Sequence, residues 1–211
     1  MENYKLLFEN QIKNIIKLEK KPCLLLHSCC APCSSYVLEA LQNIFEITLF
    51  FYNPNIYPED EYNKRFEELE KLLSLTDKSK TVNVIKADYN ANEFFDIAKG
   101  LENEPERGER CTKCYILRLF KTAEEAAKHG FDYFTTTLSI SPHKDAERLN
   151  KTGMDAEKKS GVKYLFSDFK KNNGYKRSIE LSREYGLYRQ NYCGCVYSRN
   201  EAILSGRGAV K

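Results

Sequence analysis

Long apolar runs are missing from this sequence of 211 residues. No stretch approaches the roughly 18 consecutive apolar residues that a membrane-spanning helix needs, so we expect no contact with a membrane. Residues 1–21 alternate charged with apolar side chains and contain neither an uninterrupted apolar core nor a small-residue cleavage site. We therefore expect no secretory leader and a soluble, cytoplasmic protein, whose thiols a reducing compartment keeps free of disulfides.

A strong excess of charge is missing too. The chain has 33 basic and 30 acidic side chains, a formal net charge of +3, which is too mild to identify a nucleic-acid partner but permits a local basic face. Internal repeats, low-complexity tracts and long linkers are also absent. With 42% hydrophobic residues, the chain predicts one domain over residues 1–211, with an N-terminal helix within 1–20 and a basic C-terminal segment at 170–211.

Cysteine, in contrast, is plentiful. Seven of the eight cysteines fall into three clusters, which are Cys29-Cys30-x-x-Cys33, Cys111-x-x-Cys114 and Cys193-x-Cys195. Clustered thiols in a reducing compartment favour metal binding or redox chemistry over structural disulfides. The eighth, Cys23, begins an apolar run and is most simply a small core residue.

Short β-rich runs alternate with longer helical patterns, which predicts an α/β fold with a parallel sheet between two layers of helices. The predicted strands are residues 23–27, 46–52, 82–87, 131–137 and 162–166. The predicted helices are residues 4–18, 34–42, 58–75, 92–99, 112–128 and 142–159. Pro58 and Pro142 suit the first turn of their helices, because a residue there needs no amide hydrogen.

Unusual motifs follow the first four predicted strands: HSCCAPC at 27–33, NPNIYP at 53–58, ADYN at 87–90 and TTLSISPHK at 136–144. Ligands bind at the carboxyl edge of open α/β sheets, so we expect these loops to form one site. Cys111 and Cys114 open the helix predicted at 112–128, and exposed amides at a helix N-terminus stabilise thiolates.

Cys29, Cys30, Cys111 and Cys114 can form a tetrahedral zinc site or hold the four corners of a 4Fe-4S cluster. The adjacent pair favours iron and sulfide, because neighbouring cysteines diverge in direction and suit the larger cluster. Unligated packing cysteines are the third interpretation. Cys33 is an alternative ligand, a ligand to a second metal, or a helix-start residue without a role.

Cys193-Gly194-Cys195 differs in kind, because one intervening residue closes a small ring in which a disulfide is strained and exchanges readily. The spacing therefore favours a redox-active dithiol, with metal ligation as the competing interpretation. The neighbouring Arg189 and Arg199 can lower the pKa of a thiol.

Other candidates come from the same motifs and from the C-terminal segment. Either His27 or His143 can donate a proton or bind an anion, and Lys144 is a candidate substrate or phosphate contact. Weaker pocket candidates are Asp88, Tyr89, Glu109 and Arg110. The C-terminal segment mixes basic residues and tyrosines, a pattern typical of phosphate contacts and base stacking or of a solvated helix with a tyrosine core face. Its residues are Lys170, Lys171, Tyr175, Lys176, Arg177, Arg183, Tyr185, Tyr188, Arg189, Tyr192, Arg199 and Arg207.

Read in order, the motifs HSCCAPC, NPNIYP, ERCTKC, TTLSISPHK and YRQNYCGC resemble the QueH type of epoxyqueuosine reductase over residues 27 to 195. The resemblance implies a three-layer, nucleotide α-hydrolase-like (HUP-like) sandwich. It implies an enzyme that reduces epoxyqueuosine in the anticodon loop of tRNA to queuosine, the final step of queuosine biosynthesis, without cobalamin.

The resemblance also implies roles for individual cysteines. Cys29, Cys30, Cys111 and Cys114 correspond to the ligands of the family's 4Fe-4S cluster. Cys193 and Cys195 correspond to its redox-active pair. The position of Cys33 holds Cys or Asp in this family, and because both residue types bind metals, a second mononuclear iron is favoured there.

Converting an epoxide to an alkene consumes two electrons and two protons, which a cluster with a dithiol or a second iron supplies better than one cluster alone. We expect iron to polarise the epoxide oxygen and an external electron donor to reduce Cys193 and Cys195. A zinc-binding RNA module without enzymatic activity is the alternative, but it leaves the Cys193 and Cys195 pair without a role. An ATP-dependent tRNA-thiolating enzyme would need a Gly/Ser-rich phosphate loop where HSCCAPC has no glycine.

Overall fold

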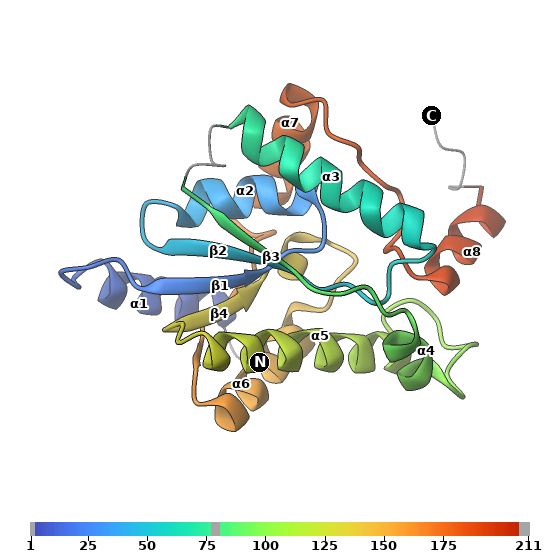
Figure 1. Ribbon diagram of the computed structural model, residues 1–211, viewed down its shortest axis with the longest axis horizontal. Coiled ribbons are helices and arrows are strands. Elements are labelled where there is room, and N and C mark those ends of the chain that lie inside the picture. The colour runs from blue at the N-terminus through green and yellow to red at the C-terminus, as the bar shows by residue number, and fades with distance from the viewer. Residues whose placement is uncertain (1–2, 77–80, 207–211) are drawn as a thin grey trace.

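The computed structural model describes residues 3–76 and 81–206. Within them, five parallel strands form one sheet in the order β3-β2-β1-β4-β5 (Figure 1). The strands are β1 Cys23–His27, β2 Glu46–Phe51, β3 Asn83–Lys86, β4 Tyr133–Thr136 and β5 Lys163–Tyr164. The chain runs outward from β1 to β3 and then returns to β4 on the other side of β1. This reversal places a crevice at the carboxyl ends of β1 and β4.

Helices cover both faces of the sheet. Figure 1 shows α2, α3 and α7 on one side and α4, α5 and α6 on the other. The helices are α1 Tyr4–Ile15, α2 Ala31–Leu41, α3 Glu59–Leu75, α4 Asn92–Ala98, α5 Glu109–Lys128, α6 Ala146–Ser160, α7 Gly174–Glu184 and α8 Val196–Leu204, with a 3₁₀ turn, η2, at Thr137–Ile140. None of those in the described ranges has the length and apolar character needed to cross a bilayer.

The central strand shows why the fold has three layers. Leu24 and Leu26 pack into the apolar cluster formed with α2 and α3, whereas Leu25 packs into the cluster formed with α5 and α6. Successive strand side chains point to opposite faces, so an uninterrupted apolar strand needs cover on both sides. The predicted α/β sandwich is confirmed, while the HUP-like assignment stays a prediction.

All five predicted strands are present, but β5 is only two residues long. Beyond Tyr164 the backbone bonds to a side chain: Gln11 donates to the Tyr164 carbonyl oxygen and accepts from the amide of Phe166. The predicted helix start at Pro142 is wrong. Helix α6 begins at Ala146 because the Asp145 carboxylate accepts a hydrogen bond from the Arg148 amide and caps the helix there.

The C-terminal segment packs against the domain in several places. The amide of Tyr57 donates to the carbonyl oxygen of Gly194, and Lys71 on α3 donates to that of Gly186. Gly194 has a φ of +117°, and a Cβ there would lie 2.9 Å from Arg65 Nη1. Of the predicted basic residues in this segment, Arg207 lies outside the described residues.

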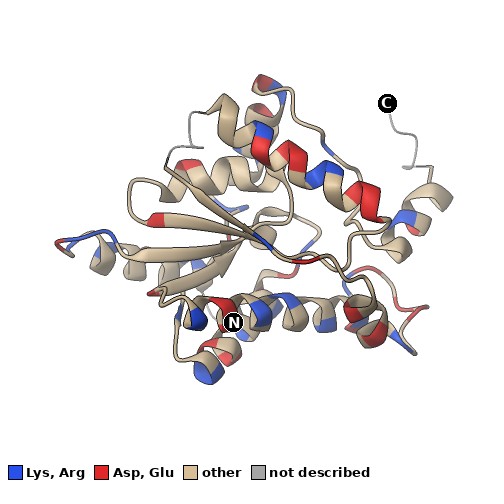
Figure 2. Cartoon of the chain, viewed as in Figure 1, with Lys and Arg blue, Asp and Glu red and all other residues tan. Residues whose placement is uncertain are grey.

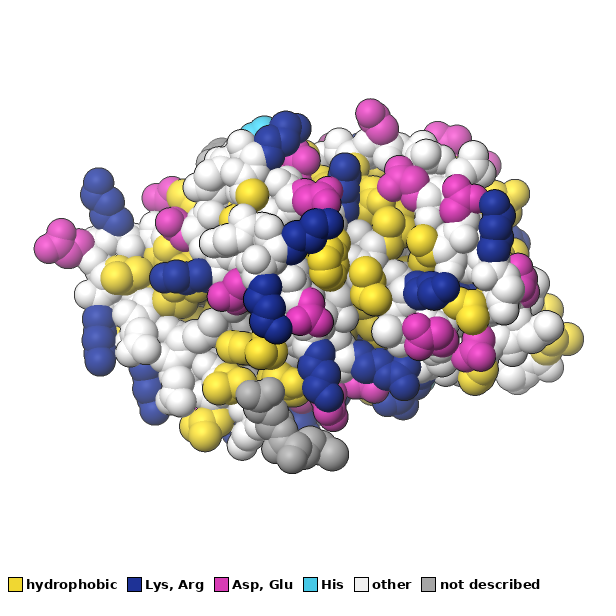
Figure 3. Space-filling view, turned by 90° about the horizontal axis from the view of Figure 1, so that it is seen from below, with side chains coloured by type: hydrophobic (Ala, Val, Ile, Leu, Met, Phe, Trp, Pro, Cys, Tyr) yellow, Lys and Arg dark blue, Asp and Glu magenta, His cyan; other side chains and the backbone are white. Residues whose placement is uncertain are grey.

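Charge is mixed over the molecule, as the small net charge predicts. Basic and acidic residues alternate along α3 in Figure 2, and they are interspersed over the face shown in Figure 3. Arg177 on α7 is paired with Glu39 at 2.8 Å, and Lys170 with Asp168 at 2.7 Å. Part of the basic character of the C-terminal segment is therefore neutralised within the chain.

Candidate metal and thiol site

A cavity of about 430 Å³ opens at the carboxyl ends of the central strands. Three of the four predicted loops line it, contributing Cys29 to Cys33, Asn53 to Ile56 and Leu138 to Lys144. The ADYN loop does not line it, so the prediction for Asp88 and Tyr89 is wrong. Instead, the hydroxyl of Tyr89 donates to the carbonyl oxygen of Ile56 and supports the second loop from behind.

The thiols of Cys29, Cys30 and Cys33 form a compact group, which we call the thiol triad. Their sulfur atoms all lie within 4.8 Å of one another, and those of Cys29 and Cys30 are 3.7 Å apart. The chain arranges them this way because β1 ends at His27 and α2 begins at Ala31, so the cysteines fall on one tight turn. Three thiols at this separation can hold a metal ion, and Cys33 belongs with the adjacent pair.

The triad shares its protons unequally. The pKa of Cys30 lies well below that of a free thiol, because Cys29 and Cys33 donate hydrogen bonds to it and Arg65 lies nearby. The pKa values of Cys29 and Cys33 are raised, chiefly by their hydrogen bonds within the triad. Cys30 is thus the most readily deprotonated thiol of the triad, and a bound cation would displace the protons of the triad.

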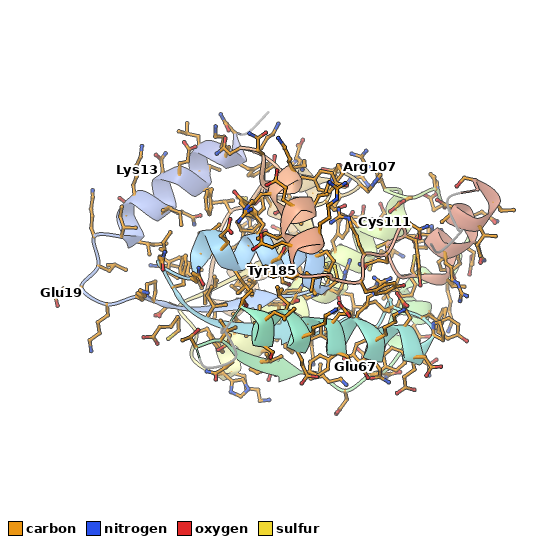
Figure 4. The ribbon with its side chains drawn as sticks, turned by 90° about the horizontal axis from the view of Figure 1, so that it is seen from above. Lys13, Glu19, Glu67, Arg107, Cys111 and Tyr185 are labelled. Carbon is orange, nitrogen blue, oxygen red and sulfur yellow. The ribbon has the colours of Figure 1, made fainter. Side chains whose placement is uncertain are left out.

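A second group of thiols, the helix-side group, lies beside the first. Cys111, Cys114, Cys193 and Cys195 line a smaller adjoining cavity. Cys111 accepts a hydrogen bond from the amide of Arg107, which has an unusual φ of +75° for a residue other than glycine. Figure 4 shows Arg107 and Cys111 together, far from Lys13 and Glu19. Cys193 lines both cavities, so the two groups meet at this residue.

Two buried arginines lie against these thiols. Arg65 Nε donates to Glu61 at 2.8 Å, and Arg118 Nε donates to the backbone of Cys114 at 3.3 Å. The Nη2 atoms of both arginines are buried with no hydrogen-bond partner among the described residues. Burial lowers the pKa of Arg118, but the neighbouring thiols, led by Cys114, more than offset this and the net shift is upward. Arg65 is paired with Glu61, whereas the described residues give Arg118 no ion pair, so the buried charge of Arg118 favours an anionic partner. Both arginines line the larger cavity.

Lys144 is a further buried cation and is 6% exposed. Its Nζ lies 3.0 Å from Cys193 Sγ and 3.2 Å from Glu106 Oε1. Lys144 lines both cavities, and its role as a substrate or phosphate contact stays a prediction. His143 lines the larger cavity as well.

Two predicted candidates have structural roles. His27 is fully buried between the hydroxyl of Thr136 and the carbonyl oxygen of Tyr52, at 2.9 and 3.0 Å. Burial lowers its pKa to about 4, so the imidazole is neutral. His27 does not line the larger cavity. Arg110 does line the smaller cavity, where its guanidinium donates to the carbonyl oxygens of Leu101 and Glu102. Glu109 lines neither cavity.

Three amide side chains add a feature that sequence reasoning missed. The Oδ1 atoms of Asn53 and Asn55 and the Oε1 of Gln190 are buried and accept no hydrogen bond within the described chain, and all three residues line the larger cavity. Asn53 and Asn55 belong to the NPNIYP motif and Gln190 to the YRQNYCGC motif. The spacing of these motifs does not show that the side-chain oxygens lack hydrogen-bond donors. Unpaired buried acceptors at a cavity wall favour a ligand that donates hydrogen bonds.

The sequence of this chain is similar to those of proteins with a known family name. The family described as "Epoxyqueuosine reductase QueH" matches residues 24–201 of the chain. The protein of that name from Streptococcus pyogenes is 47% identical over 198 residues, covering 93% of this chain and 78% of the relative. The Staphylococcus epidermidis relative is 44% identical over 206 residues, covering 94% and 87%. That of Thermotoga maritima is 38% identical over 177 residues, covering 82% and 88%.

Proposed function

Because this chain belongs to the QueH family of epoxyqueuosine reductases, we propose that it is an oxidoreductase that reduces epoxyqueuosine in tRNA to queuosine. The observation that carries this proposal is the gathering of seven thiols around two adjoining cavities that share Cys193. A family match over residues 24–201 is consistent with it. The reaction needs two electrons, two protons and a site for a modified base, and the chain offers groups for each.

Cys29, Cys30, Cys111 and Cys114 would hold a 4Fe-4S cluster, and Cys33 would contribute to a second, mononuclear iron site. The fit rests on the donor set and on Arg118, whose incompletely paired guanidinium interacts with both Cys29 and Cys114. A cluster with four thiolate ligands is anionic and would supply the partner that this cation lacks. When bound, such a cluster supplies single electrons, and an iron ion supplies a Lewis acid.

The Cys193 and Cys195 pair would supply both electrons by passing from dithiol to disulfide, and an external donor would reduce it again. Its position supports this role, because Cys193 lines the larger cavity as well as the helix-side cavity. The pair therefore lies between the space for a substrate and the cysteines of α5.

The larger cavity suits one nucleobase with its substituent, since ligand pockets commonly span about 300–1,000 Å³. Tyr175, Arg189 and Tyr192 from the C-terminal segment form part of its wall, and such side chains stack on unpaired bases. The amide oxygens of Asn53 and Asn55 would accept hydrogen bonds from hydroxyl or amino groups. The base would leave the anticodon stack to enter, as single-stranded loop bases readily do.

The test is a metal and activity analysis of anaerobically purified protein. Iron, zinc and acid-labile sulfide are measured per chain, and tRNA carrying epoxyqueuosine is then incubated with enzyme and dithionite. About four iron and four sulfide with formation of queuosine would support the proposal. Stoichiometric zinc without sulfide, unchanged after reconstitution with iron and sulfide and without turnover, would replace it with the zinc-binding RNA module.

A further inference from the structure

Lys144 and Cys193 form a buried contact that joins two distant parts of the chain. Lys144 follows the 3₁₀ turn after β4, and Cys193 lies in the C-terminal segment. Their Nζ and Sγ atoms are 3.0 Å apart, within the range of a charge-assisted hydrogen bond to sulfur. Both residues line the cavity in which a substrate would bind.

The two thiols of the proposed redox pair are not equivalent. Cys195 is the N-cap of α8, where its sulfur accepts a hydrogen bond from the amide of Ser198 at 3.4 Å. It packs among Phe94, Ala98 and Cys114 and is buried. Cys195 therefore lies inside the fold, whereas Cys193 faces the larger cavity with Lys144 beside it.

The charges around Lys144 come from several elements. Glu106 precedes α5, Cys111, Tyr115 and Arg118 lie on α5, and Cys193 lies before α8. Among the described residues, Glu106 is the carboxylate that contacts Lys144, at 3.2 Å, and it keeps Lys144 in place. Burial opposes the charge on Lys144, but Cys193, Tyr115 and Glu106 together raise its pKa well above the usual value.

We propose that Lys144 is the acid that protonates the departing epoxide oxygen, and that its ion pair with Cys193 makes Cys193 the reactive thiol of the pair. This assignment rests on the proposed reductase function. An ammonium group in contact with the electron-donating sulfur can release its proton as that sulfur loses negative charge. The loss of negative charge from the Cys193 sulfur thus favours the loss of the proton, and with it the positive charge, from Lys144.

The step balances in atoms and electrons. In the proposed step, Cys193 enters as a thiolate, Cys195 as a thiol and Lys144 as an ammonium group. Both carbon–oxygen bonds of the epoxide break, a carbon–carbon double bond forms, and a disulfide forms between the sulfurs, which give up two electrons. The oxygen leaves as water with one proton from Lys144 and one from Cys195. A dithiol reductant then returns two electrons to the pair and two protons, one to Cys195 and one to Lys144.

Other groups at the cavity fit this role less well. Arg65 and Arg118 retain their protons throughout the pH range of proteins. His27 is neutral and lies away from the cavity. His143 lines the cavity but is exposed, and within the described residues it makes no hydrogen bond to either thiol of the pair.

The experiment compares Lys144→Met, Lys144→Arg and the control Lys158→Met. Lys158 is an ion-paired but exposed lysine on α6, with Asp155 at 3.0 Å. Two quantities are measured on anaerobic, metal-loaded protein: the rate of Cys193 alkylation by iodoacetamide, resolved by peptide mass spectrometry, and turnover of tRNA carrying epoxyqueuosine with dithiothreitol as reductant. Iron content and thermal melts are recorded for every variant.

Lys144→Met is expected to slow alkylation of Cys193 by about tenfold at neutral pH, because the thiolate loses its cation. Lys144→Arg keeps the positive charge and is expected to alkylate within about threefold of wild type, yet to lose turnover by about 100-fold, because guanidinium does not release a proton. Lys158→Met should match wild type in both assays.

If Cys193 in Lys144→Met is alkylated at the wild-type rate, the proposed ion pair is wrong. If Lys144→Arg turns over substrate at the wild-type rate, Lys144 is not the acid. Failure of the wild-type protein to form queuosine would overturn the proposed function and the acid together. In that case the alkylation contrast still decides the ion pair, because it requires no substrate. The two proposals therefore fail in distinguishable ways.

Discussion

Arg118 Nε donates a hydrogen bond to the backbone carbonyl of Cys114, one turn earlier on α5 and 3.3 Å away. The guanidinium is thereby turned toward the start of its own helix, where Cys111 and Cys114 lie. It also interacts electrostatically with Cys29 from the other thiol group. One buried guanidinium, 1% exposed, thus interacts with cysteines that are more than 80 positions apart in the chain.

Replacing Arg118 by Met removes this charge and is expected to weaken retention of the cluster by roughly tenfold or more, because neighbouring groups tune metal affinity by such factors. Loss of iron during incubation with a chelator measures the effect. Lys121→Met, an exposed position on the same helix, is the control. Equal iron retention in the two variants would contradict the role assigned to Arg118.

Replacing Cys33 by Ser is expected to remove the additional iron while about four iron and four sulfide remain, because a hydroxyl is a far weaker ligand than a thiolate. Cys33→Asp should retain that iron, since a carboxylate also binds it. Metal analysis per chain provides the measurement. Cys23→Ser is the matched control, because Cys23 begins β1 and lies in neither thiol group. Loss of the whole cluster in Cys33→Ser would instead make Cys33 a cluster ligand.

Replacing Asn55 by Leu removes an acceptor that faces the cavity. We expect kcat/KM for epoxyqueuosine in tRNA to fall by about tenfold, the equivalent of about 1.4 kcal/mol for one lost hydrogen bond. Steady-state kinetics with modified tRNA would show it. Asp88→Asn, in the exposed ADYN loop away from the cavity, should leave kcat/KM unchanged. A larger loss in Asp88→Asn than in Asn55→Leu would show that the substrate approaches from the other loop.

Changing Lys170, Lys171 and Lys176 together to Ala is expected to weaken tRNA binding and flatten its salt dependence. The slope of log K against log salt should fall by about 2, because the pairing of Lys170 with Asp168 leaves Lys171 and Lys176 as the main contributors. A salt titration monitored by fluorescence anisotropy measures the slope. The control replaces Lys13, Lys17 and Lys20, which lie on or just after α1 and do not line the cavity. Equal slopes for both triple variants would place the tRNA contact elsewhere.

The sequence predicted the sheet well because its strands are short apolar runs that need cover on both faces. It misplaced the start of α6 because Pro142 and Asp145 both favour a helix start, and the side-chain cap of Asp145 decides the position. It overestimated β5 because Gln11, more than 150 positions away, takes up the backbone hydrogen bonds beyond Tyr164.

The candidate site was predictable in its residue types but not in its grouping. Spacing indicates which cysteines are neighbours along the chain, whereas the association of Cys111 with Cys193 depends on how the C-terminal segment returns to the sheet edge. The contact of Lys144 with Cys193 spans 49 positions and has no local signature. The sequence also could not predict that the side-chain oxygens of Asn53 and Asn55 accept no hydrogen bond, because this depends on which donors the fold brings close to them.

Gly194 separates the two cysteines of the proposed redox pair, and its backbone conformation is one that side chains rarely adopt. Its carbonyl oxygen holds the amide of Tyr57, and the space where a Cβ would stand is taken by Arg65, whose charge lies beside Cys30. Any larger residue would therefore strain the dithiol loop and displace the guanidinium that stabilises the thiol triad. A single methyl group at this position would disturb the proposed redox pair and the thiol triad together, although they lie near opposite ends of the sequence.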